Sequence, residues 1–241
     1  MALDRRATFG LLVGRMGSGK SWSLVRYLVD EWLPEHTGRF ITNLPLKVDA
    51  VCDYAEKVHG LDPAHVRERL NVIPEEVTDE WADGVGSPEE YIESLYQDAC
   101  RESGVEPYDE DNPIEHPLCR AMVIIDEAGT FFPADPRKEQ KYICRKTSVW
   151  MSKVRHEGGR VIFCCQNDMQ IVAPIRRLIA FQLHLTNLAD WVEPLTGVVV
   201  ADWLQVWGLF IGRYITWGPV ARKIRRGTWR GLDSRAPVHI P

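Results

Sequence analysis

One glycine-rich motif constrains the fold of this chain more than any other feature. Residues 14–21 read GRMGSGKS, which matches the pattern G-x-x-x-x-G-K-[S/T] at every fixed position. The apolar run Phe9–Val13 precedes the motif, and Lys20–Leu33 follows it with apolar residues at helical spacing that stop before Pro34. A strand, a glycine-rich turn and a helix in this order form a phosphate-binding loop. We therefore expect the chain to build an α/β fold around this unit.

The residue types of the motif have separate roles in holding a triphosphate. Glycines let the backbone wrap closely around phosphates, and the free N–H groups at the start of the following helix point at the anion. The Lys20 ammonium would reach the β- and γ-phosphates, and the Ser21 hydroxyl would bind Mg²⁺. We predict ATP and Mg²⁺ as ligands. The predicted loop contacts are Gly14, Arg15, Met16, Gly17, Ser18, Gly19, Lys20 and Ser21.

Two carboxylates follow a second apolar run, residues 121–127, which reads AMVIIDE. The apolar residues predict a buried strand, and Asp126 at its end is the candidate that holds Mg²⁺ through the water shell of the metal. Glu127 is the candidate that orients or deprotonates the attacking water. An Asp-Glu pair at this place favours hydrolysis over phosphate transfer to a small molecule. The alternative is that Glu127 is only a surface carboxylate.

Further apolar runs predict the rest of the sheet. Residues 39–43, 160–166, 180–188 and 197–201 read as strands, and residues 146–156 read as a helix that ends at Glu157-Gly-Gly. Strands that alternate with helices predict a P-loop NTPase fold, a mostly parallel sheet with helices on both faces. Gln166, at the end of one strand, is a candidate to contact the γ-phosphate or the attacking water. It would alternatively cap a turn with Asn167 and Asp168.

Charge is distributed unevenly along the chain. The net charge is −5, but residues 47–119 hold 20 acidic and 5 basic residues, a net of −15, which leaves +10 for the rest. We interpret residues 46–118 as an acidic insertion between the second strand and the Asp126 strand. Short helical pieces are expected near 64–70 and 89–100, and a mobile loop near 106–113. The basic remainder would meet a polyanion or be simply solvated surface.

Five segments of the chain, in their order along the sequence, together resemble the zonular occludens toxin (Zot) family. That family includes the assembly ATPases of filamentous phages. It belongs to the FtsK–HerA class of translocases and viral packaging ATPases. The resemblance spans roughly residues 8–190. It implies an ATPase that acts in virion assembly or DNA transfer as a ring of subunits. The segments that carry it are GRMGSGKS (14–21), GRFITNLPL (38–46), MVIIDEAGTFFP (122–133), VRHEGGRVIFCCQ (154–166) and PIRRL (174–178).

Basic residues suggest two further roles. In ring ATPases an arginine from a neighbouring subunit stabilises charge on the transferring phosphoryl group. Arg155, Arg176 and Arg177 are the candidates here, with local ion pairing as the alternative. A basic cluster after the Asp126 strand is expected to form a loop that tracks DNA phosphates without reading sequence, or a solvated face. Its members are Arg137, Lys138, Lys141, Arg145, Lys146 and Lys153.

Residues 191–241 form a Trp-rich segment and a basic tail beyond the predicted ATPase domain of residues 1–190. Trp203, Trp207, Phe210, Tyr214 and Trp217 recur at helical spacing, although Gly208 and Gly212 weaken a helix there. The longest uncharged stretch, residues 203–212, is too short for the roughly 20 residues of a membrane span. The tail would suit DNA, an anionic lipid surface or the acidic insertion of another subunit.

The sequence predicts a motor that couples ATP hydrolysis to phage DNA translocation, by genome packaging or by extrusion. We expect it in the host cytoplasm, with contact to the virion vertex or to the inner membrane surface as alternatives. The six cysteines fit that compartment, because none forms a CxxC pair or a zinc-like set. The rival interpretations are a small-molecule kinase and a non-motor protein that binds a membrane or a host protein.

Overall fold

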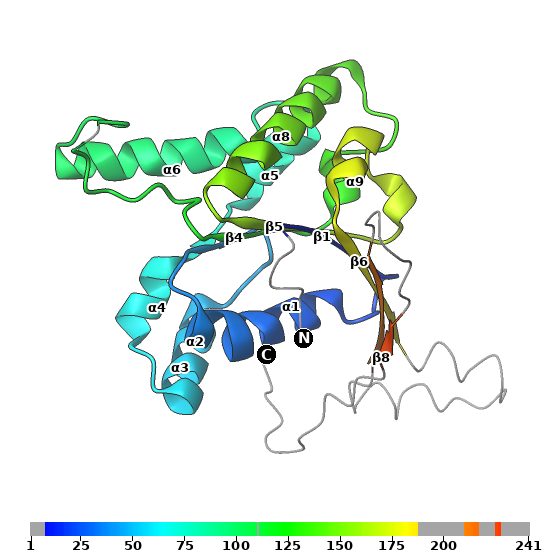
Figure 1. Ribbon diagram of the computed structural model, residues 1–241, viewed down its shortest axis with the longest axis horizontal. Coiled ribbons are helices and arrows are strands. Elements are labelled where there is room, and N and C mark those ends of the chain that lie inside the picture. The colour runs from blue at the N-terminus through cyan, green and yellow to red at the C-terminus, as the bar shows by residue number, and fades with distance from the viewer. Residues whose placement is uncertain (1–7, 110, 188–209, 217–224, 228–241) are drawn as a thin grey trace, which may run out of the picture.

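The computed structural model describes residues 8–109, 111–187, 210–216 and 225–227. Over these residues an eight-stranded sheet lies between two layers of helices (Figure 1). The strand order across the sheet is β3-β2-β4-β5-β1-β6-β7-β8. The strands are β1 (Phe9–Val13), β2 (Phe40–Thr42), β3 (Leu70–Val72), β4 (Met122–Ile125), β5 (Arg160–Cys165), β6 (Phe181–Asn187), β7 (Phe210–Thr216) and β8 (Arg225–Gly227).

Six of these strands run parallel. Every pairing from β3 across to β6 is parallel, whereas β6–β7 and β7–β8 are antiparallel. Parallel neighbours need long crossovers, and helices supply them here, so both faces of the sheet are covered. The predicted fold, a mostly parallel sheet with helices on both faces, is confirmed.

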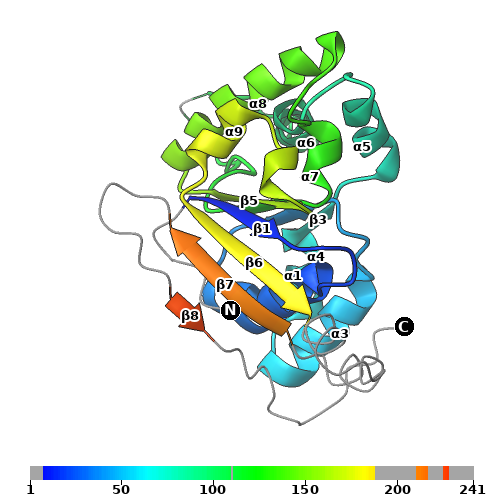
Figure 2. The same ribbon diagram turned by 90° about the vertical axis from the view of Figure 1, so that its right-hand side faces the viewer.

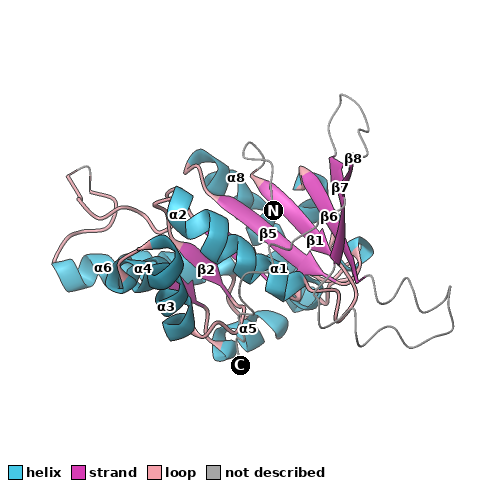
Figure 3. Cartoon of the chain, turned by 90° about the horizontal axis from the view of Figure 1, so that it is seen from below, coloured by secondary structure: helices cyan, strands magenta, loops and turns pink. Residues whose placement is uncertain are grey.

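Side chains alternate between two cores, one on each face of the sheet. On β1, Leu11 and Val13 belong to one core and Leu12 to the other. One layer (Figure 3) holds α1 (Lys20–Tyr27), η1 (Leu28–Trp32), α2 (Leu33–Glu35), α3 (Val48–His59) and α4 (Pro63–Arg69). The other holds α5 (Glu75–Ala82), α6 (Pro88–Ser103), α7 (Ala128–Phe131), α8 (Lys138–His156) and α9 (Ala173–Leu178).

The acidic segment lies between β2 and β4, as predicted, but it holds more regular structure than its composition suggested. The expected helical pieces are α4 and α6, whereas α3, α5 and β3 were not anticipated. Strand β3 pairs with β2 in the main sheet. Helices α3 and α4 join one layer, and α5 and α6 join the other. The segment is thus built into both layers of the fold.

The first helix continues past the predicted stop at Pro34. Residues Leu28–Trp32 form a π-helical turn, and α2 then includes Pro34. Pro34 lies in the last turn of this continuous helix, directly after the π-helical turn, where the Leu33 N–H donates to the Leu28 carbonyl. The carbonyls at this end are held by Arg69, whose guanidinium is buried and donates to the oxygens of Leu33 (3.2 Å), Gly38 (3.3 Å) and His36.

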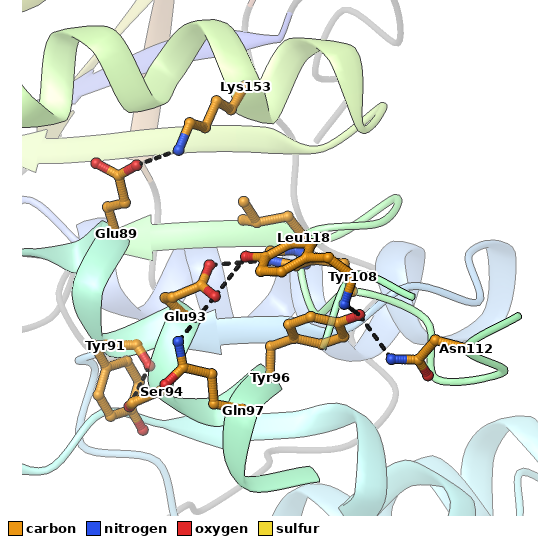
Figure 4. Close-up of polar contacts among 11 residues, drawn as sticks. Glu89, Tyr91, Glu93, Ser94, Tyr96, Gln97, Tyr108, Asn112, Leu118 and Lys153 are labelled. Carbon is orange, nitrogen blue, oxygen red and sulfur yellow. Dashed lines mark hydrogen bonds and ion pairs between the residues drawn. The ribbon is translucent and has the colours of Figure 1, made fainter. Parts of the chain in front are cut away.

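Helix α8 starts eight residues earlier than predicted, so the basic cluster lies on a helix, and the expected loop is wrong. Helix α6 lies beside α8 and supplies carboxylates to it. Glu89 forms an ion pair with Lys153 at 2.7 Å (Figure 4). Glu90 forms a second ion pair, with Lys146. Part of the acidic segment therefore neutralises part of the basic cluster within one chain.

The loop that follows α6 is tied to that helix by polar contacts (Figure 4). The Asn112 amide donates to the Tyr96 hydroxyl at 3.1 Å and to the Glu106 carbonyl at 3.0 Å. Tyr108 donates to the Glu93 carboxylate, and burial followed by that hydrogen bond raises the Tyr108 pKa. Residues 106–109 and 111–113 form the predicted loop, held by these contacts, and its mobility stays a prediction.

The sheet continues past residue 190, because β7 pairs with β6 along seven residues (Figure 2). The helix expected from Trp203 to Trp217 is therefore wrong for residues 210–216. The sequence there, FIGRYIT, combines β-branched and aromatic residues with a glycine that disfavours a helix. The expected strand at 197–201, together with Trp203, Trp207 and Trp217, lies outside the described residues. No helix of the described part is both long enough and apolar enough to span a bilayer.

We predict that Arg69→Met lowers the free energy of unfolding by about 2–4 kcal/mol, because three carbonyls lose a charged donor. Urea denaturation of the full chain measures this change. Arg67→Met is the matched control on the same helix, since the Arg67 side chain is 58% exposed and pairs only with exposed Asp49. The control should unfold like the parent. Equal stability of the two variants would contradict the proposed role of Arg69.

Candidate nucleotide-binding and catalytic site

The predicted site residues meet at one edge of the sheet. Strands β2, β4, β5 and β1 are adjacent and parallel, so their carboxyl ends lie side by side. Asn43 follows β2, Asp126 follows β4, Gln166 follows β5, and the glycine-rich loop follows β1. In a parallel α/β sheet this edge is where ligands bind.

The loop of residues 14–19 is closely packed, both against the end of β5 and within itself. The Gly14 N–H donates to the Cys165 carbonyl at 3.1 Å, which holds the loop against the end of β5. A Cβ at Gly14 would lie 2.2 Å from the Ser18 hydroxyl oxygen, so only glycine fits there. Gly19, just before α1, has φ 83°, a left-handed conformation that glycine adopts readily.

Lys20 occupies the centre of this loop. Its side chain is buried, and its ammonium donates to the carbonyls of Gly14 at 2.7 Å and Arg15 at 3.3 Å. These carbonyls hold the positive charge inside the loop. This position is compatible with the predicted role of Lys20 in phosphate binding. A bound phosphate would draw the ammonium away from the carbonyls.

Ser21 and Asp126 connect the loop to β4. The Ser21 hydroxyl donates to the Asp126 carboxylate at 3.3 Å, across 105 positions of sequence. Asn43 fixes the Asp126 backbone from the other side. Its amide oxygen accepts the Asp126 N–H at 2.7 Å, and its amide nitrogen donates to the Asp126 carbonyl at 3.1 Å. The sequence alone gave Asn43 only as the last residue of a predicted strand, although a polar residue at a strand end was the available signal.

Glu127 has an unusual backbone conformation, with φ 50° and ψ 36°. This left-handed region disfavours a long side chain by about 1–2 kcal/mol. The Glu127 N–H donates to the Asp126 carboxylate at 3.0 Å, and the side chain is exposed. Glu127 directly follows Asp126, so an exposed carboxyl side chain adjoins the Ser21–Asp126 contact in the sequence. Strain of this kind gathers at functional positions.

Gln166 lies between the two halves of the site, because β5 separates β1 from β4. Its backbone N–H donates to the Gln170 side-chain oxygen at 3.2 Å, and its own side chain is exposed. Asn167 caps the short 3₁₀ turn η2 (Asp168–Gln170) by accepting the Met169 N–H at 3.0 Å. The capping role belongs to Asn167, so the Gln166 side chain is available to the site.

The three arginine candidates lie on two helices, Arg155 on α8 and Arg176 and Arg177 on α9. Arg155 is exposed near the end of α8, just before the start of β5, which is the opposite edge of the sheet from the loop. The six residues of β5 separate these edges by about 16–20 Å. Arg155 therefore does not join the loop of its own chain. Arg176, on α9, is half-buried and contacts the Met169 sulfur at 3.0 Å.

Two buried thiols lie under the site at the end of β5. Burial, followed by the Asp126 charge, raises the Cys164 pKa well above its usual value. Burial, followed by the Asp168 charge, raises the Cys165 pKa to about 12. Both thiols are protonated near neutral pH, so they act as small apolar core residues and not as nucleophiles.

The residues of this site fit a nucleoside triphosphate with Mg²⁺. Among the residues that the structure describes, the buried Ser18 hydroxyl oxygen has no hydrogen-bond partner, and a Cβ at Gly14 would lie 2.2 Å from it. Ser21 and Asp126 offer oxygen atoms, which Mg²⁺ prefers, and Lys20 offers a compact positive charge. When bound, Mg²⁺ would neutralise charge that develops on the phosphates.

The chain is similar to one known protein family and to several solved structures. The family model described as Zonular occludens toxin (Zot) matches residues 9–190. The N-terminal domain of zonular occludens toxin from Neisseria meningitidis is 17% identical, covers 90% of this chain and 86% of its own, and has a TM-score of 0.41. No curated protein sequence matches the chain.

Two further solved structures are similar at low identity. The genome packaging NTPase B204 from Sulfolobus turreted icosahedral virus 2, in complex with ATP-gammaS, is 15% identical, covers 94% of this chain and 100% of its own, and has a TM-score of 0.45. The RadB recombinase is 13% identical, covers 90% of this chain and 83% of its own, and has a TM-score of 0.48.

We predict that Asn43→Ala raises the Mg²⁺ concentration needed for half-maximal ATP hydrolysis at least about 10-fold. The reason is that Asp126 loses the two hydrogen bonds that orient it, and outer partners of metal ligands have effects of this size. Hydrolysis assayed across a Mg²⁺ series measures the shift. Asn112→Ala, in the loop after α6, is the matched control. An unchanged Mg²⁺ dependence in the Asn43 variant would exclude an orienting role.

Glu127→Asn should stop ATP hydrolysis. Its free energy of unfolding should equal that of the parent or exceed it by up to about 1 kcal/mol. Asparagine lacks the carboxylate but adopts the left-handed region more readily than glutamate. Glu127→Gln keeps the side-chain length and should also bind ATP without turnover, with unchanged stability. Thermal unfolding and phosphate release are measured on all three proteins. Normal turnover in either variant would reject Glu127 as the base.

Proposed function

The chain belongs to the zonular occludens toxin family, and on that basis we propose that it couples ATP hydrolysis to the movement of phage DNA during virion assembly. The observation that carries the hydrolytic part is the Ser21–Asp126 contact at 3.3 Å, with Glu127 next to it. Nucleotide loop, metal ligand and base then lie at one edge of the sheet. Phosphoryl transfer requires little more than such positioning and charge neutralisation.

In this proposal each residue of the site has one role. Lys20 neutralises charge on the β- and γ-phosphates, and Ser21 and Asp126 hold Mg²⁺. Glu127 takes a proton from the attacking water, which favours hydrolysis over transfer to a metabolite. Gln166, at the strand end between the loop and Asp126, contacts the γ-phosphate or the water and so distinguishes bound ATP from ADP.

The proposed DNA contact is the amino-terminal half of α8. Lys138, Lys141 and Arg145 are exposed and recur at i, i+3 and i+7, so they share one side of the helix. Lys146 and Lys153, further along, are ion-paired with α6. The half of α8 without these pairs begins shortly after β4 and α7, near the edge that holds the site. A basic helical surface there suits a phosphate backbone without sequence readout.

A ring of subunits is part of the same proposal. Arg155 lies at the sheet edge opposite to the glycine-rich loop of its own chain. It would therefore contact bound phosphates only in the site of a neighbouring copy. Arg176 is the second candidate for that role. We place the motor in the host cytoplasm during assembly, with the virion vertex or the inner membrane surface as its docking site. Packaging and extrusion are the two forms of DNA movement that the proposal includes.

ATP turnover should rise several-fold when DNA is added, in a species with the mass of a ring. Phosphate release with no DNA, single-stranded DNA and double-stranded DNA, measured together with light-scattering mass, tests this. A monomer indifferent to DNA would overturn the motor. Phosphate transfer to a metabolite would favour a kinase. Absence of turnover with tight binding to vesicles would favour a membrane-interaction protein.

Replacing Lys138, Lys141 and Arg145 with glutamine should remove the DNA stimulation and leave basal turnover intact. The slope of log affinity for DNA against log salt should fall by about 1 for each cation lost. The matched control replaces three exposed cations of the other layer, Lys47, Lys57 and Arg67, with glutamine. Equal DNA binding by the two triple variants would rule out this surface of α8.

A further inference from the structure

One side chain, that of Gln170, holds the backbone at the end of β5. Its oxygen accepts the Gln166 N–H at 3.2 Å and the Asn167 N–H at 3.1 Å. Because two N–H donors point at this atom, it is the amide oxygen and not the amide nitrogen. The backbone of Gln166, the candidate for the γ-phosphate contact, is therefore fixed by a residue four positions further along the chain.

The same side chain packs against α7. A Cβ placed on Gly129 would lie 3.0 Å from the Gln170 Cβ and 3.4 Å from its side-chain oxygen. Gly129 is the second residue of α7, and Glu127 is the N-cap of that helix. So close an approach favours a residue without a side chain at position 129. Gln170 thus lies between the backbone of Gln166 and the helix that begins after Glu127.

The segments that follow β4 and β5 are also joined on either side of this contact. Before it, the two strands pair in parallel. Beyond it, the Val172 N–H donates to the Phe132 carbonyl at 2.9 Å, and Pro133 and Ile171 form an antiparallel bridge. Gln170 connects the two segments in between, at the height of α7. The two strand ends therefore form one connected unit.

This unit carries two of the proposed catalytic groups. The Gln166 side chain is exposed, so its placement depends mainly on where its backbone lies. A displacement of about 1 Å near the reacting atoms is enough to lower a rate by about 100-fold. A side chain that accepts from the Gln166 backbone and packs against the helix capped by Glu127 keeps the separation of the two groups constant.

We propose that Gln170 is a positioning residue for ATP hydrolysis, which holds Gln166 and Glu127 in a fixed relation so that both act on the same water molecule. The inference rests on the proposed function, since it requires the roles assigned there to these two residues. Gln170 acts through the Gln166 backbone and touches neither nucleotide nor water. It should therefore affect the rate of hydrolysis and not the affinity for nucleotide, which depends on the loop of residues 14–21.

Gln170→Met keeps the approximate length of the side chain and removes the oxygen that accepts the two N–H groups. We expect kcat for ATP hydrolysis without DNA to fall at least about 10-fold, while the Kd for ATP-γ-S with Mg²⁺ stays within about 2-fold of the parent. Phosphate release at saturating ATP and isothermal titration measure these two values. Gln97→Met, which changes an exposed glutamine of α6, is the matched control and should equal the parent in both.

Gly129→Ala disturbs the same contact from the side of α7. Alanine is a better helix former than glycine, so the fold is not at risk, but its Cβ would press on Gln170 from 3.0 Å. We expect kcat to fall at least about 3-fold with the Kd for ATP-γ-S unchanged. This variant decides the question if circular dichroism shows that Gln170→Met does not fold.

The outcomes distinguish the inference from the proposed function. If the parent hydrolyses no ATP, the hydrolytic part of the proposed function is wrong, and the role of Gln170 falls with it. If the parent hydrolyses ATP and folded Gln170→Met keeps the parent kcat, only the positioning role is wrong. A fall in kcat with an equal loss of ATP-γ-S affinity would also overturn that role, because it would show general damage to the site.

Discussion

The contact between the Ser21 hydroxyl and the Asp126 carboxylate joins the two halves of this fold. Ser21 lies in the first turn of α1, Asp126 directly follows β4, and β5 lies between β4 and β1. Their approach depends on the parallel arrangement, which brings the carboxyl ends of β1, β4 and β5 to one edge. Asn43, from a fourth strand end, then fixes the Asp126 backbone through two hydrogen bonds. The site is thus a product of sheet topology, and its precision comes from one amide side chain.

The charge asymmetry of the chain has a structural explanation in part. Carboxylates of α6 pair with Lys146 and Lys153 of α8, so the acidic segment compensates a section of the basic body. Exposed ion pairs of this kind contribute little stability each. Their main consequence is that the exposed cations of the first half of α8, Lys138, Lys141 and Arg145, lie outside these two pairs.

Much of the site was predictable because its chemistry is local in sequence. The loop motif, the AMVIID strand and the carboxylate pair each depend on neighbouring residues, and the structure brings them together as expected. Asn43 was missed because its role depends on β2 lying next to β4, which no local pattern reveals. The left-handed backbone of Glu127 was equally invisible, since glutamate gives no signal for it.

The fold was predicted less well in the acidic segment and after residue 190. Capping signals for α4 and α6 were present, as Asp62-Pro63 and Ser87-Pro88, and both side chains accept backbone N–H groups there. Helices α4 and α6 were accordingly expected, whereas α3 and α5, which have no side-chain cap at their first turn, were missed. In residues 210–216 the aromatic spacing suggested a helix, but pairing with β6 decided the outcome. Strand pairing is a long-range interaction, so spacing within a short segment does not determine it.

The most direct test of the account is an experimental structure of the full chain with Mg²⁺ and a non-hydrolysable ATP analogue. We expect the Lys20 ammonium to leave the Gly14 carbonyl for the phosphates, with the metal ion held between the Ser21 hydroxyl and Asp126. A nucleotide bound elsewhere, or bound while Lys20 stays on the Gly14 carbonyl and no metal lies between those oxygens, would contradict the central claim.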